Sequence, residues 1–211
     1  MAAFFTLKLD TLAPQNGSIS IVSLTNTRSI TATVSATDAT QMKFWGDIES
    51  AASESVASWE TYVSTKVLSL SGADGIKTVY VKFRDSVGNE TAAFSATTNL
   101  DTTGAVVTIT GPDVDTISKV NGYNVAAFSF SVDTAFVAWE VRVVPVSESV
   151  HTAGTVIGTT NGSTNMSGTN GAANTAINCT INGADLEAAS GGDGAKIIKV
   201  FVKDAAGNWS V

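Results

Sequence analysis

A pattern of residues that occurs twice constrains the fold of this chain more than any other feature. Residues 74–89 run from Asp-Gly-x-Lys through three alternating apolar side chains to Asp-x-x-Gly-Asn, and residues 193–208 follow the same order. The tripeptide Leu-Asp-Thr at residues 9–11 also returns, at residues 100–102. Internal similarity of this kind indicates two copies of one structural unit, joined near residue 100.

Within each copy, apolar residues alternate with polar ones, which is the period of a strand with one buried face. In the first copy Ile30, Ala32 and Val34 alternate with Ser and Thr, and in the second Phe128 and Phe130 alternate with Ser. Ser and Thr together number 51 of the 211 residues, which favours strands and turns over helical surfaces. Six or seven such strands in a copy, with turn signals between them, predict an all-β fold of two tandem immunoglobulin-like β-sandwich domains.

The repeat also sets the expected boundaries. We expect a strand-like arm at residues 1–9, a first domain at residues 10–100 and a second domain at residues 101–211. Short helical turns are expected near residues 47–53 and 184–189, since neither segment has the length of an amphipathic helix.

The second copy contains about 28 extra residues, in an insertion at about 145–176 that is rich in Gly, Thr, Asn and Ser. Its large apolar anchors are Val156, Ile157 and Met166. A loop of this length is either functional, contacting a receptor or a neighbour, or a tolerated surface excursion. Both interpretations stay open at this point.

Three segments resemble the bacterial and phage Ig-like repeat: residues 42–47 (Met-Lys-Phe-Trp-Gly-Asp), residues 59–62 (Trp-Glu-x-Tyr) and residues 74–89. In that family an Asp-Thr-x-x-Pro linker opens each domain and a Gly-Asn turn closes it. Residues 10–14 match this linker, whereas Ala105 replaces the proline in the second copy. The resemblance implies an Ig-like fold in a secreted bacterial surface protein or in a virion protein of a tailed phage.

The N-terminus lacks the basic segment and long apolar stretch of a signal peptide, and no run reaches 18 apolar residues. If the sequence is the whole gene product, we expect it to be made in the host cytosol and to reach a virion. The tail, the baseplate and the decorated capsid surface are the expected positions. The alternative is an extracellular protein of the bacterial cell surface.

Charge and composition narrow the classes of partner and chemistry. The formal net charge is −7, from 12 Lys and Arg against 19 Asp and Glu, and no basic cluster occurs, so nucleic acid and anionic membrane are not expected as partners. The single cysteine and the single histidine exclude an intramolecular disulfide and Cys- or His-rich metal sites.

The Asp-x-x-Gly-Asn element has two interpretations. Asp85 can cap the backbone of a turn in which Gly88 supplies a positive φ. Alternatively, Asp85 and Asn89 could meet Asp10 or Asp101 in a calcium site near the domain junction. We favour the turn, and expect no metal.

Catalytic signatures are weak. No Gly-x-Ser-x-Gly elbow, phosphate loop or dinucleotide fingerprint occurs. His151 falls in a loop and is expected to be solvated, whereas Cys179 alternates with Ile177 and Ile181 and is expected to be buried and inert. We therefore expect no enzyme and no cofactor.

The tryptophans divide into core and surface candidates. Trp139 lies in an alternating run and is expected in the core, and Trp45 should face away from its neighbour Phe44. Trp59 and Tyr62 lie in a polar setting, where flat rings could form a ligand platform for a sugar.

The two ends of the chain do not match its middle. Residues 2–10 read like residues 92–101 with one residue fewer, whereas only three residues follow the last Gly-Asn turn. We hypothesise that the arm adds as a strand to the C-terminal domain of a neighbouring copy or to a different virion protein. The assembly residues are then Phe4, Phe5, Leu7 and Leu9 in the arm, with Trp209 and Val211 at the receiving end. The alternatives are that the arm packs on its own first domain or frays.

The expected function is therefore that of a non-enzymatic structural and adhesive virion component. It would dock through strand edges and loops onto other virion proteins or onto itself. The alternative is a carbohydrate-binding adhesion module that holds a host cell-surface glycan through Trp59, Tyr62 and the long loop.

Overall fold

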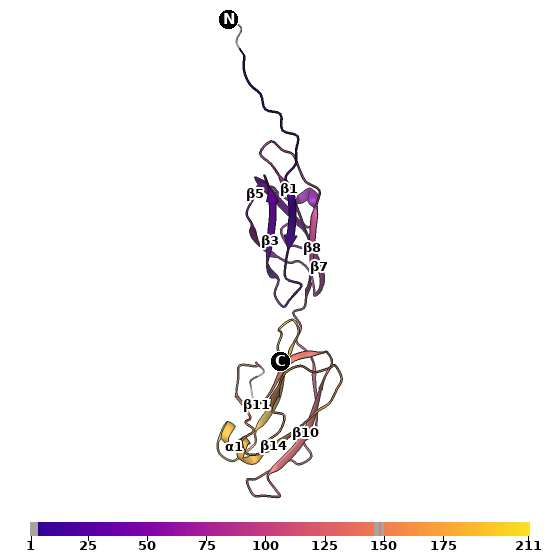
Figure 1. The fold of residues 1–211 in the computed structure, drawn as a ribbon. Helices are drawn as coiled ribbons and strands as arrows, with labels where there is room; N and C mark the ends of the chain where they lie inside the picture. Colours follow the sequence, from indigo (N-terminus) through magenta and orange to yellow (C-terminus); the bar gives the residue numbers. More distant parts are fainter. Residues whose placement is uncertain (1–3, 146–147, 149) are drawn as a thin grey trace. The chain divides into compact units, whose positions relative to one another are not determined.

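The computed structural model describes residues 4–145, 148 and 150–211 (Figure 1). Strands dominate these residues, which confirms the all-β prediction. The chain divides into two compact units, Met1–Thr102 and Thr103–Val211. Among the described residues, no helix is long and apolar enough to cross a membrane.

The first unit contains two sheets. One has the order β1-β3-β6, and the other has the order β2-β8-β7-β4-β5. The pairs are antiparallel except β2 with β8, which is parallel. The elements are β1 (Gln15–Ser20), β2 (Leu24–Thr25), β3 (Ser29–Thr37), β4 (Gln41–Gly46), the 3-10 helix η1 (Glu54–Val56), β5 (Glu60–Thr61), β6 (Thr65–Ser69), β7 (Gly75–Arg84) and β8 (Phe94–Leu100).

The core of the first unit lies between these sheets, at the alternating positions that the sequence indicated. Ile30 on β3 faces residues such as Val81 and Phe83 on β7 within one buried cluster. Phe44 belongs to this cluster, whereas the next residue, Trp45, stacks on Tyr80 with ring centroids 5.6 Å apart. The prediction that Phe44 and Trp45 face opposite sides is thus confirmed.

The second unit also has two sheets, with the orders β14-β10-β9 and β12-β11-β13, and β15 pairs with β11 in the latter. The elements are β9 (Val107–Thr110), β10 (Val125–Val132), β11 (Phe136–Val144), β12 (Thr155–Val156), β13 (Ser167–Gly168), β14 (Ile177–Asn182), α1 (Gly183–Ser190) and β15 (Ile197–Asp204).

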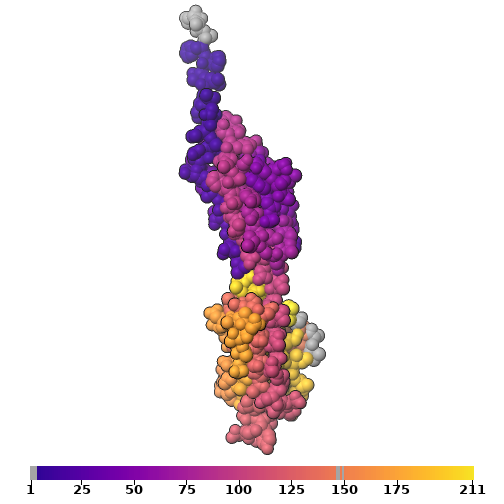
Figure 2. Space-filling view, turned by 90° about the vertical axis from the view of Figure 1, so that its right-hand side faces the viewer, coloured from indigo at the N-terminus to yellow at the C-terminus, as the bar shows by residue number. Residues whose placement is uncertain are grey.

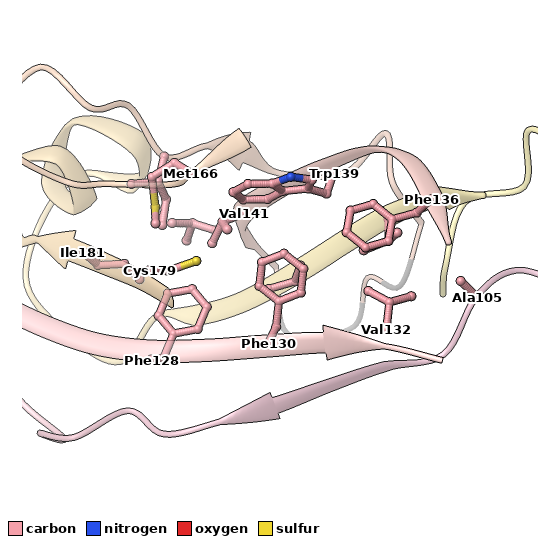
Figure 3. Close-up of a cluster of buried hydrophobic side chains, with 14 residues drawn as sticks. Ala105, Phe128, Phe130, Val132, Phe136, Trp139, Val141, Met166, Cys179 and Ile181 are labelled. Carbon is pink, nitrogen blue, oxygen red and sulfur yellow. The ribbon is translucent and has the colours of Figure 1, made fainter. Parts of the chain in front are cut away.

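Aromatic side chains fill the space between these sheets (Figure 3). Phe128 and Phe130 project from β10 toward Trp139 and Val141 of β11, and the ring centroids of Phe130 and Trp139 are 5.1 Å apart. Trp139 is buried, as the alternation predicted. Each unit is therefore β-sandwich-like, with one apolar layer between two sheets.

Of the two expected short helices, the one in the second unit lies where it was predicted, and the one in the first unit lies further along the chain. Helix α1 occupies the predicted segment, and the Asn182 side chain caps it by accepting a hydrogen bond from the Ala184 N–H. The helical turn expected at residues 47–53 is wrong: Asp47 accepts a hydrogen bond from the Thr78 N–H, which fixes a loop there. A helical turn, η1, follows this loop.

The insertion is part of the second unit. Strands β12 and β13 extend the sheet from β11, and the side chains of Ile157 and Met166 are each only 1% exposed. Asp185 at the start of α1 accepts hydrogen bonds from the backbone N–H groups of Asn161 and Ser163. This part of the insertion therefore packs against the unit and is held by a buried carboxylate.

We expect Phe130→Ala to lower the free energy of unfolding of the second unit by about 3–5 kcal/mol, since it leaves a cavity between the sheets. Urea titration followed by tryptophan fluorescence measures this loss. The control is Val125→Ala on the same strand, whose side chain is 45% exposed and whose loss should cost under about 1 kcal/mol. Equal effects of the two changes would contradict the assigned core.

Candidate functional site

The carboxylates of the repeated turn bind the backbone of their own turn. One Asp85 oxygen accepts hydrogen bonds from the Val87 and Asn89 N–H groups, at 2.9 Å each, and the other accepts from the Asn89 amide at 2.7 Å. In the second copy, Asp204 accepts hydrogen bonds from the Gly207 and Asn208 N–H groups and from the Asn208 amide. The turn interpretation of Asp-x-x-Gly-Asn is confirmed.

These bonds change the ionisation of Asp85. Burial disfavours the charged carboxylate, but hydrogen bonds from Asn89, Val87 and Gly88 outweigh that effect and lower the pKa of Asp85. The folded pKa therefore lies below the value of about 3.9 for an Asp side chain in an unfolded chain. Ionised Asp85 accordingly stabilises the first unit.

The stabilisation by Asp85 is fully present above about pH 3.9 and is lost as the pH falls through the lowered folded pKa. We expect Asp85→Asn to lower the free energy of unfolding at neutral pH, with a difference from the wild type that shrinks in strong acid. Urea titrations at several pH values test this, with the exposed Asp38→Asn as control. A difference that does not vary with pH would contradict the assignment.

The His151 side chain is only 20% exposed, so the expectation that it lies in solvent is wrong. Its ring stacks on Trp209, with centroids 3.5 Å apart, and its Nε2 lies 3.1 Å from a Glu140 carboxylate oxygen. Arg142 donates to the same oxygen at 2.8 Å. Burial disfavours ionised Glu140, but Arg142 and then His151 lower the pKa of its carboxyl. These contacts hold the histidine ring by stacking and by a hydrogen bond.

The chain's single thiol is buried, as expected. Cys179 is 1% exposed, and burial raises the pKa of its thiol to about 11. Its sulfur donates a hydrogen bond to the carbonyl oxygen of Asn165, 3.2 Å away. A protonated and enclosed thiol is a poor nucleophile.

Trp59 and Tyr62, the candidate sugar-binding platform, contact opposite faces of one sheet. Trp59 is half-buried, with Lys43 Nζ 4.7 Å and Arg84 Cζ 4.4 Å from its ring centroid. Tyr62 packs edge-on against Phe83, with centroids 6.0 Å apart. Because Phe83 and Arg84 are successive residues of β7, their side chains point to opposite faces. Trp59 and Tyr62 therefore do not share one flat surface.

The N-terminal arm stands clear of its unit, as its indigo segment in Figure 2 illustrates. Its described residues lie outside any strand, and the side chains of Phe4, Phe5, Leu7 and Leu9 are 82–93% exposed. Packing of the arm on its own unit, one of the two alternatives considered, is wrong for these side chains. Directly after the arm, the Asn89 amide donates to the Asp10 carbonyl oxygen at 3.3 Å, which ties the base of the arm to the turn.

Because the arm side chains contact water, we expect deletion of residues 1–9 to leave the unfolding of both units unchanged within about 0.5 kcal/mol. Urea and thermal unfolding of the deleted and full-length chains at low concentration make the comparison. A larger loss of stability would mean that the arm packs on one of the units.

The expected receiving end is partly occupied by its own unit. Trp209 stacks on His151 and forms a bridge with Lys203, and the Ser210 N–H donates to the Val202 carbonyl oxygen at 2.8 Å. Val211 is 95% exposed. Trp209 therefore contributes to its own unit, and Val211 extends from it.

A groove of about 760 Å³ opens along the start of β15. Its apolar lining comes from both sheets, from α1 and from the loop between β9 and β10: Ile109, Pro112, Val114, Ile117, Ala126, Phe128, Ile181, Leu186 and Ile198. Sequence reasoning missed this groove, because it depends on which strand edge is left uncovered. The repeat contained the signal, since residues 194–200 correspond to residues 75–81 of β7, which pair with β8.

No protein-family model matches the sequence, and no curated protein matches it. Among solved structures, the fold is similar to chitinase ChiA74 from Bacillus thuringiensis, with 12% sequence identity and a TM-score of 0.34. The match covers 92% of this chain and spans only 30% of the chitinase chain. With so low a TM-score, any assignment of function has to come from the residues of this chain.

Proposed function

We propose that the two units are tandem Ig-like domains of a non-enzymatic structural component of a tailed-phage virion. The component would belong to the tail, the baseplate or the capsid surface, and would dock onto other virion proteins through strand edges and loops. The repeated Asp-Gly-x-Lys to Gly-Asn segments and the residues 10–14 linker support the Ig-like assignment. The two-sheet organisation of each unit is consistent with it.

The exposed arm is the observation that carries the docking proposal. Exposed apolar side chains are normal when scattered, but here Phe5, Leu7 and Leu9 follow one another at the spacing of a single strand face. A segment of this pattern is suited to join a sheet edge of a partner, where backbone hydrogen bonds add to side-chain burial.

The polar side chains considered as candidate catalytic or metal-binding groups form hydrogen bonds that stabilise the fold. The carboxylates of Asp85 and Asp204 accept backbone N–H groups of their own turns, and His151 is paired with Glu140. Burial keeps the Cys179 thiol protonated. These hydrogen bonds and this burial support a structural function over a catalytic one.

The test is detection of the chain in purified particles of the phage whose genome encodes it. We expect the protein to co-sediment with tailed particles in a density gradient, and antibody labelling to place it on the tail, baseplate or capsid surface. Deletion of residues 1–9 should reduce its incorporation, whereas Ile76→Ala, an exposed change on β7, should leave incorporation unchanged.

Recovery of the chain only as free protein would contradict the proposal. Recovery on the host cell wall, with a change in tryptophan fluorescence on addition of wall glycan, would favour the adhesion alternative.

A further inference from the structure

The outer edge of β15 is open over most of its length. On one side β15 pairs with β11 from Ile197 to Asp204. On the other side, within the described residues, backbone bonds are made by the last three residues, Val202 to Asp204, with residues 208–210. The remaining N–H and C=O groups of this edge are a template for a further strand.

The groove beside this edge is apolar enough to hold side chains of such a strand. Ile198 of β15 lies on one side, and Phe128 of β10 and Ile181 of β14 lie on the other. Figure 3 shows Phe128 and Ile181 within the buried cluster, beside Cys179. The groove is thus an opening into the core of the second unit.

The first unit contains a strand at the corresponding place. There β8 pairs with residues 75–81 of β7, and its side chains alternate between the core and solvent. The partners of β8 correspond to residues 194–200 by the internal repeat. The position and the direction of a strand in the groove can therefore be taken from β8.

The arm has the sequence of such a strand. Matching Leu-Asp-Thr at residues 9–11 with residues 100–102 sets three arm side chains at the inward positions of β8. In the arm these are Phe5, Leu7 and Leu9, at the places of Ala96, Thr98 and Leu100. All three are apolar, and Thr6 and Lys8 fall on the outward face.

Thr98 shows what this inward position prefers. Its side chain is 2% exposed, and its hydroxyl oxygen has no hydrogen-bond partner among the described residues. A buried hydroxyl without a partner is unfavourable. Leu7, at the same place in the arm, fills the position without that cost.

The arm leaves the first unit far from where the chain passes to the second unit. The Asp10 carbonyl oxygen is held by Asn89, and Thr102 is held by Asp74, at the other end of β7. Ten residues of β7 span about 33 Å, whereas residues 4–9 extended span about 20 Å. This geometry favours a groove on another molecule.

We infer that residues 4–10 of one copy add as an antiparallel strand to residues 193–199 of a second copy, which are the open start of β15 and the segment just before it. In this register Leu9 lies opposite Gly194, Leu7 opposite Lys196 and Phe5 opposite Ile198. The inference rests on the proposed docking function and names the partner as a second copy of the chain. Because donor and acceptor surfaces differ, the contact is head-to-tail and joins several copies in a ring or an open series.

Light scattering of the full-length chain over a concentration series tests the self-association. We expect the mass to rise from 21.6 kDa toward multiples of it. Leu7→Asp, on the inward face, should abolish the rise, whereas Lys8→Asp, on the outward face, should retain it. Both residues lie in the exposed arm, so neither change can unfold a unit.

Disulfide trapping tests the register. Lys8 and Ala195 correspond to Asn99 and Ile76, which are paired across β8 and β7. Mixed Lys8→Cys and Ala195→Cys chains should therefore form a covalent heterodimer on oxidation. Thr6→Cys mixed with Ala195→Cys is the control and should form little, since its two residues are out of register. Cys179 is buried and should not compete.

Three outcomes would overturn the inference: a constant mass of one chain, association that Leu7→Asp leaves intact, or trapping within one chain of the Lys8→Cys/Ala195→Cys double variant. None of these would affect the proposed function, which fails only if the chain is absent from phage particles. A chain present in particles but monomeric in solution would mean that the arm docks onto a different virion protein.

Discussion

The structure depends on the requirement that each strand find hydrogen-bond partners for its backbone. In the first unit, β7 meets this requirement on both edges, with β4 on one side and β8 on the other. In the second unit, β15 pairs along its length with β11 on one side, whereas on the other side the described residues bond only its last three residues, Val202 to Asp204. We propose that this imbalance makes the exposed arm a strand donor and the apolar groove its acceptor.

The repeated turn couples the strands to the ends of each unit. Asp85 uses its charge to organise the backbone after β7, and Asn89 uses the same turn to hold the carbonyl of Asp10. The turn therefore does two things: it directs the chain toward β8 and it fixes the base of the arm. A neutral or displaced side chain at Asp85 would loosen both.

Local sequence patterns predicted the features that depend on residues close in sequence, namely strands, their buried faces and their turns. The alternation of Val79, Val81 and Phe83 identified a half-buried strand, and the Asp-x-x-Gly-Asn spacing identified its turn. The arm's apolar side chains were also recognisable from the repeat. The Ig-like assignment stays a prediction that rests on these same patterns.

Features that depend on distant partners could not be predicted. His151 was expected in solvent because nothing beside it in sequence would bury it, yet it meets Glu140 of β11 and Trp209, which follows β15. The insertion was judged by its small polar residues, whereas a carboxylate on α1, that of Asp185, holds it. The groove at Ile198 likewise depends on which edge of β15 is paired with another strand, and composition alone cannot indicate this.

The parallel pair of β2 and β8 has a mechanical consequence for the first unit. The Asn99 N–H donates to the Ser23 carbonyl oxygen, and the Asp101 N–H donates to that of Thr25, at 2.9 Å each. Because the two strands run in the same direction, tension between the start and the end of the unit acts along them in opposite senses. It therefore loads these bonds together in shear, a geometry that resists rupture better than one in which bonds open one after another.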